Sequence, residues 1–210
     1  MKNNLFAFFA LILMTSFSFA QQKGQVEAGL NIGLNFSNIT DNDYYSSVPT
    51  NTRLAFNIGG SAEYYFSDRW GIKAKLIYDR KGWADDLFYY EDPYEEFITD
   101  YALDYITIPV MADFHFGRAR NWYVNFGPYI GFLTSATVVD PDVDIKELIN
   151  KEDFGLAFGG GYKFLINEHV KMFFEIDHQA GLDNIFEDGR GTSITNGRTS
   201  VNTGLLFLLY

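Results

Sequence analysis

The sequence predicts an all-β protein, specifically an eight-stranded antiparallel up-and-down transmembrane β-barrel, and three observations support this prediction. Seven segments alternate between apolar residues and polar or tiny ones, and an eighth apolar segment follows at 200–210. The connections between these segments are alternately long and short, as in such barrels. Aromatic residues make up 18% of the chain although the mean hydropathy is only −0.10, so apolar residues are dispersed rather than gathered in long runs.

The first 20 residues are typical of a signal peptide. Lys2 supplies a positive start, Leu5–Met14 is an unbroken apolar run, and small residues precede a cleavage site after Ala20. A run of about ten apolar residues is too short to span a bilayer. An uncleaved anchor or a buried N-terminal helix is the alternative. We predict a signal peptide over 1–20 and a barrel domain over 21–210.

Alternation predicts each strand in turn. From Val26 to Phe36 every even position is apolar, whereas the odd positions from Glu27 to Ser37 are polar or glycine. Successive strand side chains point to opposite faces, so this strand has one apolar and one polar or small face. The pattern recurs over 53–66, 70–81, 106–116, 122–132, 153–164 and 171–180. The last segment, 200–210, is apolar on both faces, so the sequence leaves its orientation open.

The seven connections alternate strictly in length. The long ones are 38–52, 84–100, 138–152 and 183–197, and the short ones are 67–69, 117–121 and 167–169. In outer-membrane barrels short turns face the periplasm and long loops face outward. An even strand count then puts both chain ends on the periplasmic side. The connections 84–100 and 138–152 are the most acidic and the least strand-like.

A soluble barrel with its large apolar side chains inside is the alternative arrangement. The interior of an eight-stranded barrel is just wide enough for side chains to fill it. It has no room for the Phe, Trp, Leu and Ile side chains of one face of every strand, whereas Gly, Asn and Ser fit there. We therefore predict that the apolar face contacts lipid and that the polar face lines a narrow lumen.

The predicted lumen carries charges of both signs. They are Glu27, Arg53, Glu63, Lys73, Lys75, Asp79, Asp113, Lys163, Lys171, Glu175 and Asp177. Charges in a narrow lumen persist only when they are paired or hydrogen-bonded. We therefore expect a salt-bridge network that plugs the barrel, and a selective ion path is the rival use of these charges.

Aromatic residues and prolines supply two further expectations. Aromatic side chains gather at strand ends, where girdles form at the membrane interfaces. The girdle positions are Phe36, Phe66, Trp70, Trp83, Phe116, Trp122 and Phe164. Pro109 and Pro128 each remove a backbone donor from a strand, so we expect a bulge or a register break at each.

Two acidic segments match ion-binding patterns in part. Asp140, Asp142 and Asp144 occupy positions one, three and five of a calcium loop. Ile145 stands where glycine is needed and Lys151 where glutamate is needed, so a solvated loop is favoured. The acids of 84–100 form either a hydrated loop or a surface site for divalent cations. They are Asp85, Asp86, Glu91, Asp92, Glu95, Glu96 and Asp100.

The sequence shows no recognisable active site. Catalysis needs a base near a nucleophile or paired acids. His115 and His169 fall near the short turns, and His178 falls on the lipid-facing register. The glycines of 155–161 lie on a strand, so we interpret them as space-making rather than as a phosphate loop. We predict no enzyme activity, no cofactor, and no catalytic, cofactor-binding or metal-binding residues.

Several short motifs resemble a known family. They are Tyr105-Ile-Thr-Ile-Pro-Val110, Gly127-Pro-Tyr-Ile-Gly131, Asp153-Phe-Gly-Leu156 and Gly159-Gly-Gly-Tyr162. Together they resemble the small outer-membrane β-barrel domain (porin-like, PorT-like) that is widespread in the Bacteroidota. The resemblance implies an integral outer-membrane protein without an assigned biochemical role. PorT-like relatives are linked to a protein secretion apparatus, but no motif in this chain singles out that branch.

The net charge of −11 disfavours a nucleic-acid partner, because phosphate binding needs clustered Lys and Arg. The absence of cysteine excludes disulfides and thiolate metal sites. We predict an exported, monomeric protein of the outer membrane of a Gram-negative bacterium, a scaffold presenting acidic surface loops. Its partners are the lipid bilayer and, as candidates, other envelope or secretion proteins. The alternatives are a PorT-like secretion component and a narrow channel.

Overall fold

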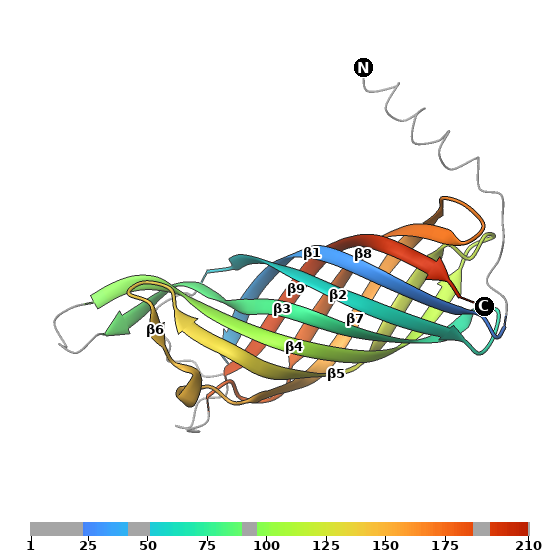
Figure 1. The fold of residues 1–210 in the computed structure, drawn as a ribbon. Helices are drawn as coiled ribbons and strands as arrows, with labels where there is room; N and C mark the ends of the chain where they lie inside the picture. The colour runs from blue at the N-terminus through green and yellow to red at the C-terminus, as the bar shows by residue number, and fades with distance from the viewer. Residues whose placement is uncertain (1–22, 42–50, 90–95, 187–193, 210) are drawn as a thin grey trace, which may run out of the picture.

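The computed structural model describes residues 23–41, 51–89, 96–186 and 194–209, most of which form antiparallel strands (Figure 1). The strands are β1 (Val26–Asp41), β2 (Arg53–Tyr65), β3 (Trp70–Tyr89), β4 (Glu96–Phe116), β5 (Trp122–Val138), β6 (Val143–Asp144), β7 (Glu152–Leu165), β8 (Val170–Gly181) and β9 (Ile194–Leu208). One 3₁₀ turn, η1 (Lys146–Leu148), follows β6. No helix among the described residues is long and apolar enough to cross a membrane.

Eight of the strands close into a ring, which confirms the predicted fold. Each of these strands pairs antiparallel with its neighbours, β1 pairs with β9, and β4 pairs with β5 to close the ring. The ninth strand, β6, is a short addition that pairs with the end of β5. The short connections gather at one end of the barrel, the turn end, and the long ones at the other, the loop end (Figure 1).

The predicted faces are confirmed along the strands. Apolar side chains such as Ile32, Leu76 and Phe126 are exposed on the outside, while their polar neighbours are buried inside. The undetermined last strand follows the same rule, because Ser200 and Asn202 are buried and Val201 is exposed. An aromatic belt runs around the turn end through successive ring contacts. Its members are Trp70, Phe114, Phe116, Trp122, Tyr162, Phe164 and Phe174.

Trp83 was predicted to lie in an interfacial girdle, and this is wrong. Its side chain is 1% exposed and points into the barrel. The reason is register, because Trp83 has the same parity as Lys81, which is also buried inside. Its ring stacks on Tyr101 with ring centroids 4.6 Å apart, and its Nε1 donates to an Asp86 carboxylate oxygen at 2.7 Å.

The predicted loop 84–100 is largely strand, so that boundary is also wrong. β3 and β4 are 20 and 21 residues long and remain paired from Trp83↔Tyr101 to Tyr89↔Glu96. A membrane strand needs only about 9–11 residues, so this hairpin extends beyond the barrel (Figure 1). Antiparallel pairing satisfies its backbone while charged side chains reach water. Glu91, Asp92 and Glu95 lie outside the described residues.

The bulges predicted at Pro109 and Pro128 are absent from the β4–β5 ladder, where the register is identical on both sides of the prolines. The register shifts lie instead at Asp104/Tyr105 and Trp83/Asp86. Gly127 explains the tolerance, because a Cβ there would collide with the Val110 carbonyl oxygen. The two strands therefore approach closely where the prolines remove donors, and the flanking pairs hold the register.

Two exposed isoleucines test where the bilayer lies on this barrel. Ile58 is 52% exposed in the middle of β2, and Ile98 is 72% exposed on the extended hairpin. Arg at the midplane of a membrane barrel costs about 2–4 kcal/mol, and the cost falls toward zero outside the apolar band. Ile58→Arg should therefore lower the free energy of unfolding in lipid vesicles by about that amount. Ile98→Arg is the matched control and should change it little; equal losses would contradict this placement of the bilayer.

Candidate functional site in the barrel lumen

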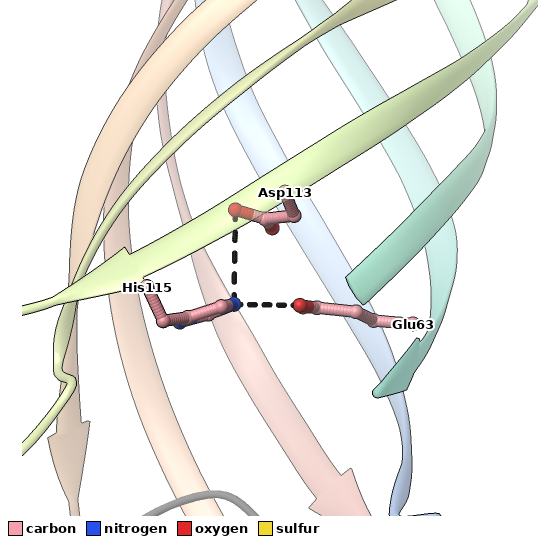
Figure 2. Close-up of side chains that lie close together, drawn as sticks. All are labelled: Glu63, Asp113 and His115. Carbon is pink, nitrogen blue, oxygen red and sulfur yellow. Dashed lines mark hydrogen bonds and ion pairs between the residues drawn. The ribbon is translucent and has the colours of Figure 1, made fainter. Parts of the chain in front are cut away.

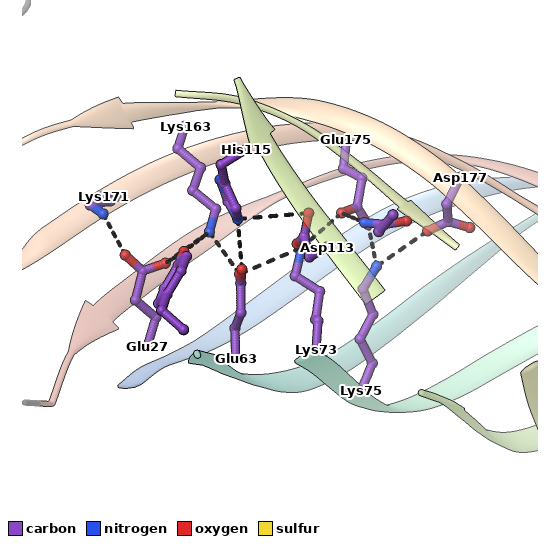
Figure 3. Close-up of polar contacts among 12 residues, drawn as sticks. Glu27, Glu63, Lys73, Lys75, Asp113, His115, Lys163, Lys171, Glu175 and Asp177 are labelled. Atoms are coloured by element: carbon purple, nitrogen blue, oxygen red, sulfur yellow. Dashed lines mark hydrogen bonds and ion pairs between the residues drawn. The ribbon is translucent and has the colours of Figure 1, made fainter. Parts of the chain in front are cut away.

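The lumen is filled by side chains in three zones, which run from the turn end to the loop end. A charged network occupies the first, amide and hydroxyl side chains the second, and an apolar cluster the third. Because strand alternation points every second residue inward, each zone draws on several strands. Figure 3 shows the charged zone.

Lys163 on β7 is the centre of the network at the turn end. Its Nζ lies 2.8 Å from a Glu27 oxygen on β1 and 2.8 Å from a Glu63 oxygen on β2. It also donates to the Tyr65 hydroxyl at 2.7 Å, and that hydroxyl donates to Glu27 at 2.9 Å. Lys171 forms a second ion pair with Glu27. One buried ammonium group thus holds two carboxylates and joins strands that are not neighbours in the sheet.

Glu63 continues the network to β4 through a cluster of three ionisable groups (Figure 2). His115 Nε2 lies 2.7 Å from Glu63 Oε1 and 3.7 Å from Asp113 Oδ1. The three ligand atoms lie within 4.8 Å of one another, as in a metal site. Lys163 and Lys73 already contact these carboxylates at 2.8 and 2.9 Å, and their ammonium groups supply the charge that a cation would bring. We therefore assign the cluster to the lysine network.

Lys73 and Lys75 carry the network across the lumen from β3 to β8. Lys73 Nζ lies 2.9 Å from Asp113 and 3.4 Å from Glu175, and it sits 4.2 Å from the centroid of the Tyr123 ring. Lys75 pairs with Glu175 and, at 3.5 Å, with Asp177. Strands β3 and β8 lie on different sides of the ring, so these contacts close the bore directly.

The charged network ends at Arg198 on β9, and amide side chains fill the next zone of the lumen. Arg198 contacts Asp177 at 2.9 Å and Asp79 at 3.3 Å. Asn35 Nδ2 donates to Asp79 at 2.8 Å, and Asn57 Nδ2 donates to the Asn35 side-chain oxygen at 2.7 Å. These short side chains are buried, so hydrogen bonding between them compensates for lost hydration.

An apolar cluster, the outer cap, closes the loop end. Its buried members are Trp83, Leu103, Tyr105, Leu133, Ala136, Val138, Ile145, Ile149 and Ile185. The segment after β5 turns back over the barrel opening and inserts Ile145 and Ile149. Asn150 N–H donates to the Ile185 carbonyl at 2.7 Å, which joins the two folded connections. Just below the cap, Lys81 pairs with Asp153 at 2.8 Å and lies 4.6 Å from the Tyr129 ring centroid.

Every predicted lumen charge faces the interior, and the expected cross-lumen pairing is confirmed for ten of them. Arg53 is half-buried and donates to the Lys81 carbonyl at 3.1 Å. The prediction omitted Lys81, His115, Asp153 and Arg198. The first three lie on positions that alternation already placed inward, whereas Arg198 fell just outside the predicted last strand.

The remaining candidates make ordinary contacts. Asp140, Asp142 and Asp144 are exposed on the connection between β5 and β7, and Asp144 accepts the Lys146 N–H at 2.8 Å. Asp85 accepts from Asn51 at 2.8 Å, and its own N–H donates to Asp100. The glycines of β7 do make space, because a Cβ on Gly161 would meet the Tyr123 hydroxyl.

The exterior of the barrel is apolar, and its interior is polar and filled by side chains. These features define the chain as an outer-membrane β-barrel protein, and it is located in the outer membrane. Residues 19–187 match the family described as outer membrane protein beta-barrel domain, and the chain belongs to that family. No curated protein matches the sequence.

Solved structures with the same fold are distant in sequence. OprG from Pseudomonas aeruginosa is 10% identical with a TM-score of 0.56, over 91% of this chain and 98% of that one. Neisserial surface protein A is 14% identical with a TM-score of 0.52, over 87% and 96%. The N-terminal barrel domain of Pseudomonas aeruginosa OprF is 15% identical with a TM-score of 0.51, over 90% and 100%. These likenesses concern the fold.

Removal of the central ammonium group tests the network. Lys163→Met leaves Glu27 and Glu63 buried without the cation that they share. Loss of one partner of a buried pair costs about 3–5 kcal/mol, and we expect that loss in urea unfolding of the vesicle-bound barrel. Asp68→Asn is the control, because it breaks an exposed 3.4 Å pair with Arg120 and should cost less than about 1 kcal/mol. A loss at Lys163 no larger than the control would refute the central role of that pairing.

Proposed function

We propose that this protein is a monomeric membrane-anchored scaffold whose lumen is permanently closed and whose working surface is its loop end. The observation that carries the proposal is the double closure of the lumen, by the salt-bridge network and by the outer cap. A bore filled in this way leaves no path for solutes, so interaction at the exposed surface is the function that remains. The proposal includes no enzymatic activity.

The exposed surface of the outer cap suggests the kind of partner. Exposed carboxylates and the exposed apolar side chains of Val139 and Leu148 lie on the loop-end connections, and a basic surface with apolar contacts would complement them. They belong to Asp140, Asp142, Asp144, Glu147, Glu152 and Asp183. We further propose that residues 1–20 are removed on export and that the loop end faces outward, as the length rule for such barrels suggests.

Conductance tests the closed lumen. The wild-type barrel in planar bilayers should show no sustained porin-size conductance, because eight strands leave room for side chains but not for a wide aqueous bore. Trp83→Ala hollows the outer cap and leaves the lysine network intact, so it should also remain closed. A steady large conductance from verified wild-type monomer would refute the closed lumen, and a steady small one would favour the narrow-channel alternative.

Site-specific photo-crosslinking tests the scaffold. A photoreactive residue replacing Leu148, which is 61% exposed on the outer cap, should give protein adducts in intact cells. The matched control replaces Ile32, which is 60% exposed on the middle of β1 and should contact lipid. Protein adducts at Leu148 that are absent at Ile32 are the expected result. Lipid adducts alone at both positions would contradict a scaffold role.

A further inference from the structure

The outward faces of three adjacent strands change from apolar to polar on approach to the loop end. On β1 the outward residue Phe36 is followed by Asn38 and Thr40. The same change occurs between Val201 and Thr199 on β9, and β8 changes from Ile176 to His178. The strands are neighbours in the order β1, β9, β8, so the change marks one continuous level on the barrel wall. This level corresponds to an interface between acyl chains and lipid headgroups.

The wall is hollowed at this level. A cavity of about 360 Å³ opens on the outside of the barrel and is lined by Thr40, His178, Ala180, Gly181, Thr195 and Gly197 among others. Ala180 and Gly197 are Cα partners in the β8–β9 ladder, so no side chain larger than a methyl group covers this part of the wall. The hollow therefore results from small residues at facing positions.

The polar groups of the hollow include an imidazole of fixed orientation and a hydroxyl that makes no hydrogen bond within the described part of the chain. His178 Nδ1 lies 2.9 Å from the Thr199 hydroxyl, and the imidazole lies 5.0 Å from the Phe158 ring centroid, so its orientation is fixed. Thr195 is only 8% exposed, and its hydroxyl makes no hydrogen bond within the described ranges of the chain. The hydroxyl oxygen itself is accessible from the hollow, so it can bond a ligand there.

The chemistry of the lining suits an uncharged, hydroxyl-rich group. The cavity is lined by hydroxyls, an imidazole, backbone amide groups, Asn196 and the apolar side chain of Leu182, and none of its described lining residues is Lys, Arg, Asp or Glu. Arg198, the nearest cation in sequence, is 1% exposed and points inward to Asp177 and Asp79. Such a set hydrogen-bonds sugar hydroxyls and offers no counter-charge to a phosphate.

An apolar path adjoins the polar hollow. Phe158 lies exposed on the neighbouring strand β7, where it pairs with His178, and Ile176 and Phe174 of β8 continue the exposed apolar surface toward the turn end. A molecule with a polar group in the hollow would lay its apolar part along these side chains. We propose that this hollow binds the sugar headgroup of a glycolipid, with an acyl chain on β7 and β8. The orientation proposed above places it in the outer leaflet.

Binding can be measured by native mass spectrometry of the barrel in phosphatidylcholine vesicles that contain a minor fraction of a galactosyl diacylglycerol. Gly197→Val fills the hollow, and the backbone permits it, since the nearest atom to an added Cβ is the Asn38 carbonyl oxygen at 3.4 Å. The fraction of protein that retains glycolipid should fall at least about fivefold, the factor expected when an interaction worth one hydrogen bond is lost. Gly60→Val on β2 is the matched control, because its nearest neighbour lies at 3.6 Å and it is remote from the hollow.

Two further arms make the result decisive. Thr195→Val removes the underused hydroxyl and keeps the side-chain shape, so it should weaken glycolipid retention even if Gly197→Val fails to fold. Soluble methyl galactoside should not displace the lipid, since it lacks the acyl chain that β7 and β8 would contact. Retention unchanged in the folded variants, an equal loss in Gly60→Val, equal retention of phosphatidylcholine and glycolipid, or displacement by the free sugar would each overturn the proposal. None of these outcomes bears on conductance, so the scaffold proposal is tested separately.

Discussion

Pairing between charges on different strands is the interaction on which the interior of this barrel depends. The charges in the bore are buried, and a buried charge without a partner is far more costly than one in water. Seven inward carboxylates face six lysine and arginine cations. His115 adds hydrogen bonds to this network, because its two ring nitrogens face the Glu63 carboxylate and the Arg120 carbonyl.

The need to pair the buried charges also explains why certain uncharged residues occupy the interior. Gly159 on β7 leaves room for Asp177 and Asn125, and Gly161 leaves room for Tyr123. Tyr65 and Tyr123 place aromatic faces against the Lys163 ammonium group at 5.3 Å, and the Tyr65 hydroxyl links that ammonium group to Glu27. The interior thus selects side chains by size and by donor or acceptor capacity, while the exterior selects only for apolarity.

This difference decides how much could be predicted from the sequence. The faces of the strands, the strand number and the inward charges follow from a period of two and from the alternating connection lengths, which are local properties. The partners of Lys73 and Lys163 come from strands far apart in the chain, so no local pattern identifies them. The outer cap was missed for a related reason. Ile145 and Ile149 lie in an acidic connection with no strand alternation, and only its folding over the opening places them beside Trp83. The same parity that put Lys81 inside could have placed Trp83 correctly.

The salt-bridge network and the outer cap are stabilised by different interactions. This difference explains why substitutions are better tolerated at the loop end than inside the barrel. The central members of the charged network, such as Glu63, Lys73 and Lys163, each contact two or more others, so replacing one leaves several buried charges unmatched. The outer cap is held by apolar packing, which tolerates substitutions that conserve volume. Its surface residues, such as Leu148 and Glu147, contribute little to that packing because they are exposed. A barrel built in this way keeps its membrane-spanning part fixed while the surface above it is free to change.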